Sequence, residues 1–215
     1  GLGASFSFFV AHHMSTIEGG MICTDDDDLA QMLKIVRANG WDRNLSAKEK
    51  KRIRALNSID SEFEAKYTFY DLGFNLRPTE ITGFLGLIQL KYLQSNIEKR
   101  NQNHFSIVNE IENNSDLIYT EHSHMDFLSP FALPVVCKSE ELKRYYCQEF
   151  AGAGIEIRPM IAGNIQKQPF YKKYVVDEFK CPGSDFLDKN SFYCGNYPEL
   201  TVEDIETIKS CLISK

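Results

Sequence analysis

Hydrophobic and polar residues alternate in short blocks at the start of the chain. Residues 5–10 (SFSFFV) form an aromatic-rich, mostly apolar run that is typical of a buried strand, and residues 21–24 form a second short run. A polar corner from His12 to Gly20 separates the two runs. The pattern predicts a strand, a corner and a return strand, with His12 and His13 at the edge of a sheet where a ligand can bind.

An acidic run introduces the first helical pattern. Residues 25–28 are all aspartate, and apolar residues recur at helical spacing from Leu29 to Val36 before the pattern stops at Gly40. Calcium loops alternate acidic ligands with other residues and need a glycine at the turn, which this run does not offer. We therefore interpret the aspartates as residues that cap a helix N-terminus and complement its dipole.

Two helices are predicted in the middle of the chain. Pro78 suits the first turn of a helix that continues to about Tyr92, and apolar residues at helical spacing predict a second helix over about 94–112. Within the first of these helices, Gly83 and Gly86 leave room for another backbone to approach closely.

The pattern changes near Asn114 to that of a small α/β unit. Two prolines in its first strand indicate a position at a sheet edge. In order, the predicted elements are a strand at 127–136, a helix at 139–151, a strand at 155–157, a strand at 192–196 and a capped helix at 201–212. We therefore expect an α/β protein with one domain at 1–113 and a small C-terminal domain at 114–215.

Composition narrows the class of protein. The chain has 215 residues, 43% of them hydrophobic, and a net charge of −6, which allows one large domain or two small ones but gives no basic face for nucleic acid. No apolar run is long enough for a membrane span, and no signal peptide is recognisable. The six cysteines are scattered without a C-x-x-C pair, which indicates reduced thiols in a cytoplasmic protein rather than disulfides or a zinc site.

Two other polar clusters are interpreted without a function. The basic residues from Lys48 to Arg54 have acidic neighbours and no interleaved aromatic residues, so we expect a solvated surface segment. His122 and His124 lie beside acidic residues in a polar loop and are expected to bind metal only adventitiously, so no metal site is predicted.

The corner carries the most specific motif of the chain. Residues 5–21 read SFSFFVAHHMSTIEGGM and resemble the cofactor-attachment segment S-F-x-x-x-K-x-x-x-x-x-E-G-G of the DegT/DnrJ/EryC1/StrS family of sugar aminotransferases. The match extends in order through G-F-N-x-R at 73–77, I-x-I-R-P at 155–159 and Y-P at 197–198. The resemblance implies a fold-type-I enzyme that depends on pyridoxal phosphate and acts on nucleotide-linked keto-sugars. Of such an enzyme, the chain would represent the rest of the large domain and the small C-terminal domain.

His12 stands where the family has its lysine. Within the family this histidine implies the 3-dehydratase branch. The H-H pair, together with G-W-x-R-N at 40–44, is most similar to the members that act on GDP-4-keto-6-deoxymannose in colitose and lipopolysaccharide O-antigen synthesis. A second histidine-bearing branch holds an iron–sulfur cluster on closely spaced cysteines, but residues 39–71 contain no cysteine.

The exchange of lysine for histidine changes the chemistry that the resemblance implies. A lysine amine holds the cofactor as a Schiff base and returns a proton to the sugar, whereas an imidazole takes a proton but cannot form that bond. The resemblance therefore implies that the cofactor acts as pyridoxamine phosphate and that His12 is the base. The C3 hydroxyl of an NDP-4-keto-6-deoxy sugar then leaves, and L-glutamate is the implied amino donor.

Further cofactor-binding residues follow from matching positions. By resemblance, Ser7 binds the cofactor phosphate, and His13 lies beside the base at the cofactor. Asn75 matches an asparagine that reaches the phosphate bound by a partner subunit, which implies a homodimer.

Three arginines are candidates for binding substrate. Arginine pairs with carboxylates and phosphates in bidentate fashion, so Arg43, Arg77 and Arg158 are candidates for the glutamate carboxylate or the nucleotide phosphate, while a surface or structural role fits each equally. Asn39 departs from the pattern, since the resembling branch has a histidine in that segment.

Two alternatives remain open. An ordinary sugar aminotransferase of this family would need a lysine in the corner, and none lies between Gly1 and Met32. A truncated relative without catalysis would keep only the dimerising surfaces. The family's phosphate loop, ring-stacking aromatic residue and pyridine-binding aspartate belong to its N-terminal half and are not recognisable here, so the chain by itself is expected to be inactive.

Overall fold

The computed structural model describes residues 1–215. The chain divides into two compact units, Gly1–Lys91 and Tyr92–Lys215. The long helix α4 (Glu80–Asn113) begins in the first unit and ends in the second. The division into domains at 1–113 and 114–215, which the change of pattern near Asn114 predicts, stays a prediction.

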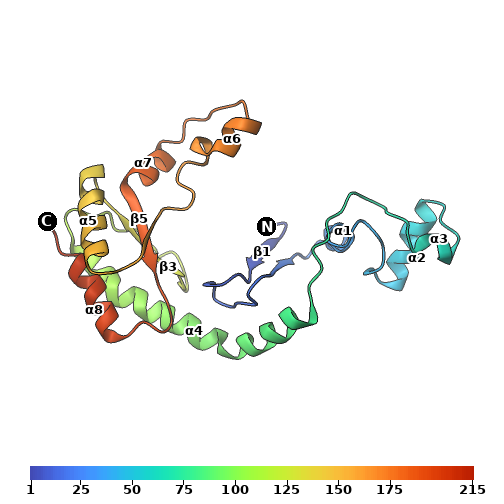
Figure 1. Cartoon of the computed structure of the whole chain (residues 1–215), viewed down its shortest axis with the longest axis horizontal. Helices are drawn as coiled ribbons and strands as arrows, with labels where there is room; N and C mark the ends of the chain where they lie inside the picture. The colour runs from blue at the N-terminus through green and yellow to red at the C-terminus, as the bar shows by residue number, and fades with distance from the viewer. The chain divides into compact units, whose positions relative to one another are not determined.

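The first unit begins with a hairpin of two strands (Figure 1). β1 (Ala4–Ser7) and β2 (Gly20–Cys23) pair antiparallel, with Ser7 opposite Gly20. The strand predicted over 5–10 is therefore too long, because residues 8–10 already enter the corner. Every residue of both strands is exposed, contrary to the burial expected from the aromatic run, because the sheet of this unit has only two strands.

Helix α1 (Asp27–Val36) confirms the interpretation of the acidic run. The carboxylate of Asp26 accepts a hydrogen bond from the backbone N of Leu29 at 2.8 Å, so Asp26 is the N-cap. Asp27 and Asp28 occupy the first turn, where their charges favour the positive end of the helix dipole.

Two short helices follow in the first unit. α2 (Ala47–Leu56) begins after Ser46, whose hydroxyl accepts a hydrogen bond from the backbone N of Glu49 at 3.3 Å. No residue of α2 is buried, which confirms the solvated surface segment. α3 (Glu62–Ala65) begins after the cap Ser61 and was not predicted, since 4 residues are too few to show a period.

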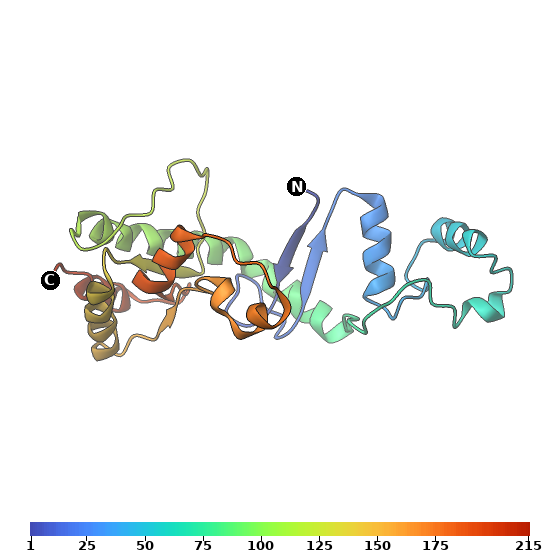
Figure 2. The ribbon, with the colours of Figure 1, turned by 90° about the horizontal axis from the view of Figure 1, so that it is seen from above.

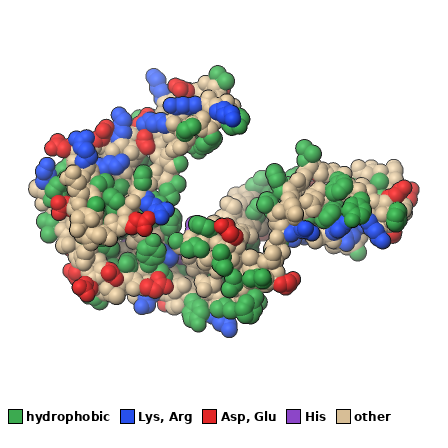
Figure 3. Space-filling view, viewed as in Figure 1, with side chains coloured by type: hydrophobic (Ala, Val, Ile, Leu, Met, Phe, Trp, Pro, Cys, Tyr) green, Lys and Arg blue, Asp and Glu red, His purple; other side chains and the backbone are tan.

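Helix α4 is one continuous helix where two were predicted. Residues 92–94 contain neither glycine nor proline, so nothing in the sequence interrupts the backbone hydrogen bonds. Most large apolar residues of the part within the first unit are exposed, and Figure 3 shows hydrophobic side chains gathered along it. The buried residues of α4 lie in its second half: Arg100, His104, Ile107, Val108 and Ile111.

The two glycines of α4 differ in their surroundings. A Cβ added at Gly86 would lie 3.4 Å from Cγ2 of Thr16, an ordinary contact with a side chain of the corner between β1 and β2 rather than the predicted close approach of another backbone. A Cβ added at Gly83 would have no atom within 4 Å, so nothing in this structure approaches it closely.

The second unit is built on a three-stranded antiparallel sheet (Figure 2). The strand order is β3–β5–β4, with β3 at Ala132–Val136, β5 at Ser191–Gly195 and β4 at Ile157–Pro159. β3 therefore lies at an edge and contains Pro134, which confirms the position that its prolines predicted.

The core of the second unit joins this sheet to three helices. α5 (Glu140–Gly152), α8 (Val202–Cys211) and the second half of α4 all contribute buried side chains. The rings of Phe150 in α5 and Phe192 in β5 meet edge to face, with 5.3 Å between their centroids. α8 begins with a reciprocal capping box at Thr201, as predicted.

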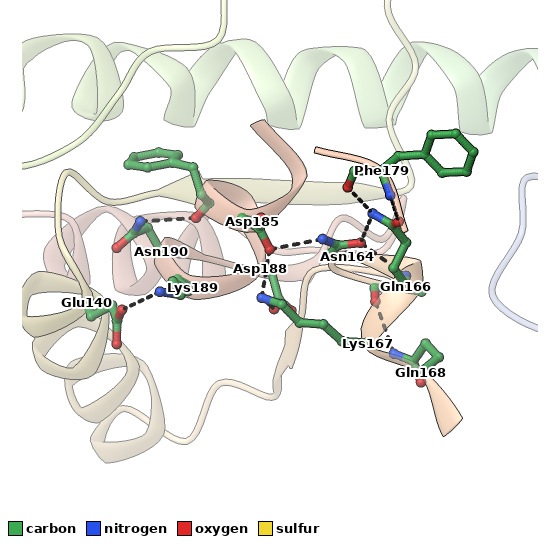
Figure 4. A network of polar contacts seen from close by, with 12 residues as sticks. Glu140, Asn164, Gln166, Lys167, Gln168, Phe179, Asp185, Asp188, Lys189 and Asn190 are labelled. Carbon is green, nitrogen blue, oxygen red and sulfur yellow. Dashed lines mark hydrogen bonds and ion pairs between the residues drawn. The ribbon is translucent and has the colours of Figure 1, made fainter. Parts of the chain in front are cut away.

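The connection between β4 and β5 contains short helices that were not predicted. They are η1 (Ile165–Lys167), α6 (Pro169–Tyr174) and α7 (Pro182–Asn190). A polar network joins η1 to α7 (Figure 4), in which Lys167 Nζ lies 2.9 Å from Asp185 Oδ1 and 2.8 Å from Asp188 Oδ2. None of the helices in the structure combines the length and the apolar character needed to cross a membrane.

Candidate functional site

The corner between β1 and β2 is closed by hydrogen bonds between its two sides. The backbone N of Phe8 donates to the carbonyl of Gly19 at 2.9 Å, and the backbone N of Thr16 donates to the carbonyl of Phe8 at 2.8 Å. Thr16 is buried, and its hydroxyl donates to the carbonyl of Glu18 at 2.7 Å. The segment that carries His12 is therefore held at both of its ends.

Backbone conformation constrains the same corner. Ala11 and Ile17 have φ angles of 76° and 71°, in the left-handed region that residues with a Cβ rarely adopt. At Gly19 φ is 146°, and an added Cβ would lie 2.7 Å from the hydroxyl oxygen of Thr16. A side chain at Gly19 would therefore displace Thr16, which explains in physical terms why a glycine follows Glu18.

Ser7, His12 and His13 all lie on this corner. The backbone N of His12 donates to the carbonyl of Phe9 at 3.3 Å, and the side chains of His12 and His13 are half-buried. Ser7 is the exposed last residue of β1, and its Oγ accepts a hydrogen bond from the backbone N of Phe9 at 3.3 Å. A hydroxyl that accepts from the backbone retains its proton for donation to an anion.

The turn that carries Asn75 is docked on the segment that follows α1. The backbone N of Asn39 donates to the carbonyl of Phe74 at 2.8 Å, and Ala38 and Asn75 form an antiparallel bridge. At Gly40 φ is 85°, and an added Cβ would lie 1.9 Å from the carbonyl oxygen of Asp71. The two segments therefore pack backbone against backbone, and no side chain fits at Gly40.

Two of the three predicted arginines meet at Trp41. The Arg43 guanidinium lies 3.6 Å from the centroid of the buried Trp41 ring, and that of Arg77 lies 5.9 Å from it. Arg77 Nε donates to Oδ1 of Asn75 at 2.9 Å, so this arginine and the predicted asparagine also contact each other. Arg43, Arg77 and Asn75 therefore form one cluster, which we call the Trp41 cluster.

An ion pair to the buried carboxylate of Asp42, next to this cluster, was not predicted. Oδ2 of Asp42 accepts from Arg54 Nε at 2.6 Å, and Arg54 Nη1 donates to Glu62 Oε1 at 2.6 Å. The hydrogen bond to Asp42 raises the pKa of Arg54 above its usual range. Burial, followed by the charge of Asp42, raises the pKa of Tyr70, whose hydroxyl lies 3.5 Å from Asp42 Oδ2. No sequence pattern predicts these partners, because they come from different helices and loops.

A family model provides the comparison that decides the class of protein. The model described as the DegT/DnrJ/EryC1/StrS aminotransferase family matches residues 1–213. The chain belongs to this family. The resemblance inferred from the motifs around His12 is confirmed.

Curated members of the family align along nearly the whole chain. The GDP-4-keto-6-deoxy-D-mannose 3-dehydratase of Escherichia coli O55:H7 is 31% identical over 214 residues, which are 99% of this chain and 54% of that protein. The protein of the same name from Yersinia pseudotuberculosis is 33% identical over an alignment of 224 positions, gaps included, that again covers 99% of this chain and 54% of the relative. The chain thus spans about half the length of the curated relatives it matches.

Solved structures of the family confirm the predicted α/β, fold-type-I architecture. The E. coli GDP-4-keto-6-deoxy-D-mannose 3-dehydratase with bound hydrated PLP matches with a TM-score of 0.83 at 29% identity, over 99% of this chain and 54% of that one. A structure of such a dehydratase with bound GDP-perosamine matches with a TM-score of 0.86 at 30% identity, over 99% of this chain and 55% of that one. The chain is therefore a member of a PLP-dependent family of enzymes that modify nucleotide-linked sugars.

One residue predicted from the family pattern lies in the second unit. Arg158 is in β4, where its guanidinium lies 2.7 Å from Oε1 of Glu156. The hydrogen bond to Glu156 raises the pKa of Arg158, and both side chains are exposed. The structure thus joins Ser7, His12 and His13 on one corner and gathers Arg43, Arg77 and Asn75 at Trp41, while Arg158 belongs to the other unit.

Proposed function

We propose that this protein provides the C-terminal half of an enzyme that removes the C3 hydroxyl of an NDP-4-keto-6-deoxy sugar, with His12 as the base. The observation that carries the proposal is a histidine in the lysine position of the family motif, on a corner closed by the bonds of Phe8 and Thr16. The named relatives support GDP as the nucleotide.

The residues of the corner fit pyridoxamine phosphate as the cofactor. When bound, the cofactor supplies an amine for the sugar ketone and a ring that accepts electrons. The Ser7 hydroxyl is exposed beside the turn of His12, which suits an interaction with the cofactor phosphate. His13 follows the base and is half-buried at the same corner, where it would contact the cofactor.

His12 would move a proton without being covalently attached. An imidazole accepts a proton near neutral pH and passes it on, but it does not form a stable bond with the cofactor aldehyde. With no lysine between Gly1 and Met32, an amine transfer that depends on a lysine at this corner is disfavoured. Loss of the C3 hydroxyl is the outcome that fits a histidine best.

Asn75 and the arginines would bind the anionic groups. Because Oδ1 of Asn75 accepts from Arg77, its amide nitrogen is oriented away from that bond and can donate to a phosphate, which we propose to be that of a second subunit in a homodimer. Arg43 and Arg77 carry two positive charges over one ring, which suits a diphosphate or the carboxylate of L-glutamate. Arg158, which lies in the second unit, stays a candidate for binding substrate on the family pattern alone.

The test is product analysis with the full-length protein. It is incubated with pyridoxamine phosphate, L-glutamate and GDP-4-keto-6-deoxymannose, and we expect ammonia and a 3-deoxy-4-keto sugar. An amino sugar would instead identify an aminotransferase, and no turnover together with retained dimerisation would identify a non-catalytic relative. His12→Asn should abolish turnover, while His124→Asn, the same change at an exposed loop histidine, should preserve it.

A further inference from the structure

The segment between Asp42 and Tyr67 closes on itself. It leaves the Trp41 cluster at Arg43, forms α2 and α3, and returns, so that Arg43 Nη2 donates to the carbonyl of Lys66 at 2.7 Å. The Arg43 guanidinium also lies 5.3 Å from the centroid of the Tyr67 ring. Lys66 and Tyr67, at the end of the segment, therefore hold the guanidinium of Arg43, at its start.

Arg54 connects the two ends of this segment. Its Nε bonds the carboxylate of Asp42, whose side chain is 2% exposed, and its Nη1 bonds Glu62, the first residue of α3. The guanidinium of Arg54 thus pairs with two carboxylates, and the Arg54 side chain is only 18% exposed. Arg54 is therefore a link within the protein rather than a binder of external anions.

The position of α3 depends on this link. A helix of 4 residues has too few internal hydrogen bonds to be stable without outside contacts. Lys66 is the C-cap residue of α3, so the carbonyl that holds Arg43 moves with this helix. Without Arg54, moreover, the buried carboxylate of Asp42 would lose its cation, which destabilises the segment that joins it to α3.

We propose that Arg54 is a positioning residue that keeps the guanidinium of Arg43 over Trp41, ready to bind an anionic oxygen group of the substrates. The inference rests on the proposed function, in which Arg43 binds a nucleotide diphosphate or the glutamate carboxylate. The inference adds Arg54, which touches neither ligand. Arg54 would act on Arg43 through Glu62, α3 and the carbonyl of Lys66.

Trp41 provides the measurement, because it is the only tryptophan of the chain. Its fluorescence, taken as the difference between the full-length protein and a Trp41→Phe variant, is followed during titration with inorganic pyrophosphate, GDP and L-glutamate. A response to pyrophosphate and GDP identifies a diphosphate site, and a response to glutamate alone identifies a carboxylate site. Arg54→Gln is expected to raise the Kd of the active ligand about tenfold and to shift the emission of the free protein in the same direction as Arg43→Gln.

The control for Arg54→Gln is Arg52→Gln. Arg52 lies on the same helix and pairs with Glu49 at 2.7 Å, but its side chain is 53% exposed and has no bond to Asp42 or Glu62. The change removes the same charge and should alter the Kd less than about twofold. A weakening equal to that of Arg54→Gln would mean that only net charge matters, and the inference would be wrong.

A second variant keeps the test decisive if Arg54→Gln does not fold. Glu62→Gln removes the exposed arm of the link, because the Glu62 side chain is 87% exposed, and leaves the pair of Arg54 with Asp42 intact. We expect its Kd to rise about threefold with the fold preserved. If wild-type protein binds and Arg43→Gln does not, but Arg54→Gln and Glu62→Gln bind like wild type, the inference fails and the proposed function stands. If wild-type protein binds none of the probes, the proposed role of Arg43 fails first.

Discussion

Arg100 and Asn196 hold each other across the second unit. Nη1 of Arg100 donates to the carbonyl of Asn196, and Nδ2 of Asn196 donates to the carbonyl of Arg100 at 2.9 Å. Asn196 Nδ2 also bonds the carbonyl of Pro130 at 2.9 Å, which brings in the segment before β3. Burial lowers the pKa of Arg100, which has carbonyls rather than a carboxylate as its partners. The pair therefore fixes α4 through hydrogen bonds to the end of the sheet where β3 begins and β5 ends.

Asn196→Ala should destabilise the protein strongly for this reason. The change removes the amide that donates to the carbonyls of both Arg100 and Pro130 at a largely buried site, and we expect a loss of about 2–3 kcal/mol in the free energy of unfolding. Urea denaturation followed by circular dichroism measures it. In Asn113→Ala the lost amide bonds the carbonyl of Asn109 on the exposed surface of α4, so that variant should change stability by less than about 0.5 kcal/mol. Equal losses in the two variants would refute a special role of Asn196.

The acidic run offers a comparison between neighbouring residues of one type. Asp26 caps α1 by accepting from the backbone N of Leu29, whereas Asp25 lies outside the helix and is exposed. Asp26→Ala should therefore cost about 1 kcal/mol of stability, while Asp25→Ala should cost close to nothing. Thermal melts of the two variants decide the question. If Asp25→Ala proved the more harmful change, the capping interpretation would have to be abandoned.

Gly40 should tolerate no side chain. Its positive φ disfavours every other residue, and an added Cβ would overlap the carbonyl oxygen of Asp71, so Gly40→Ala must separate the two docked segments. We expect a loss of more than about 3 kcal/mol and a red shift of the emission of the neighbouring Trp41. Gly83→Ala is the matched control, because a Cβ there meets nothing within 4 Å and alanine favours the helix. A wild-type emission spectrum for Gly40→Ala would contradict the proposed packing.

Local signals allowed much of the fold to be predicted. Caps such as Asp26 and Thr201 lie within a few residues of the groups they bond, so their sequence context contains the whole interaction. Pro134 indicates an edge strand because proline has no backbone N–H to donate. The corner that carries His12 was predicted from the alternation of apolar and polar residues, and the motif around His12 gave the family.

The parts that escaped prediction depend on contacts between distant residues. Asp42 and Arg54 are 12 residues apart, and nothing in the sequence distinguishes Arg54 from the basic residues around it on α2. The exposure of the strand with Phe6 was also missed, since an apolar run does not tell how many strands will join a sheet. Both failures concern tertiary packing, which a local pattern does not encode.

A buried histidine of the second unit, His104, makes the stability of the folded protein sensitive to acid. His104 is 7% exposed, and neither of its ring nitrogens has a hydrogen-bond partner. Its ring meets that of His122 edge to face, with 5.4 Å between the centroids, and His122 Nδ1 lies 3.3 Å from the hydroxyl of Tyr119. Burial, followed by the charge of His122, lowers the pKa of His104 below its usual value of 6.5.

This lowered pKa sets the direction of the pH dependence. Because unfolded chains take up a proton at His104 near pH 6.5 and the folded protein does so only at lower pH, stability is lost as the pH falls through 6.5 toward the folded pKa. His104→Leu removes the titrating group without breaking a hydrogen bond, so the variant should lose less stability than wild type between about pH 7 and pH 5. Urea denaturation across this range measures the difference. His124→Gln, a change at an exposed histidine, should retain the wild-type slope. If His104→Leu kept that slope too, the acid sensitivity would have to come from other groups.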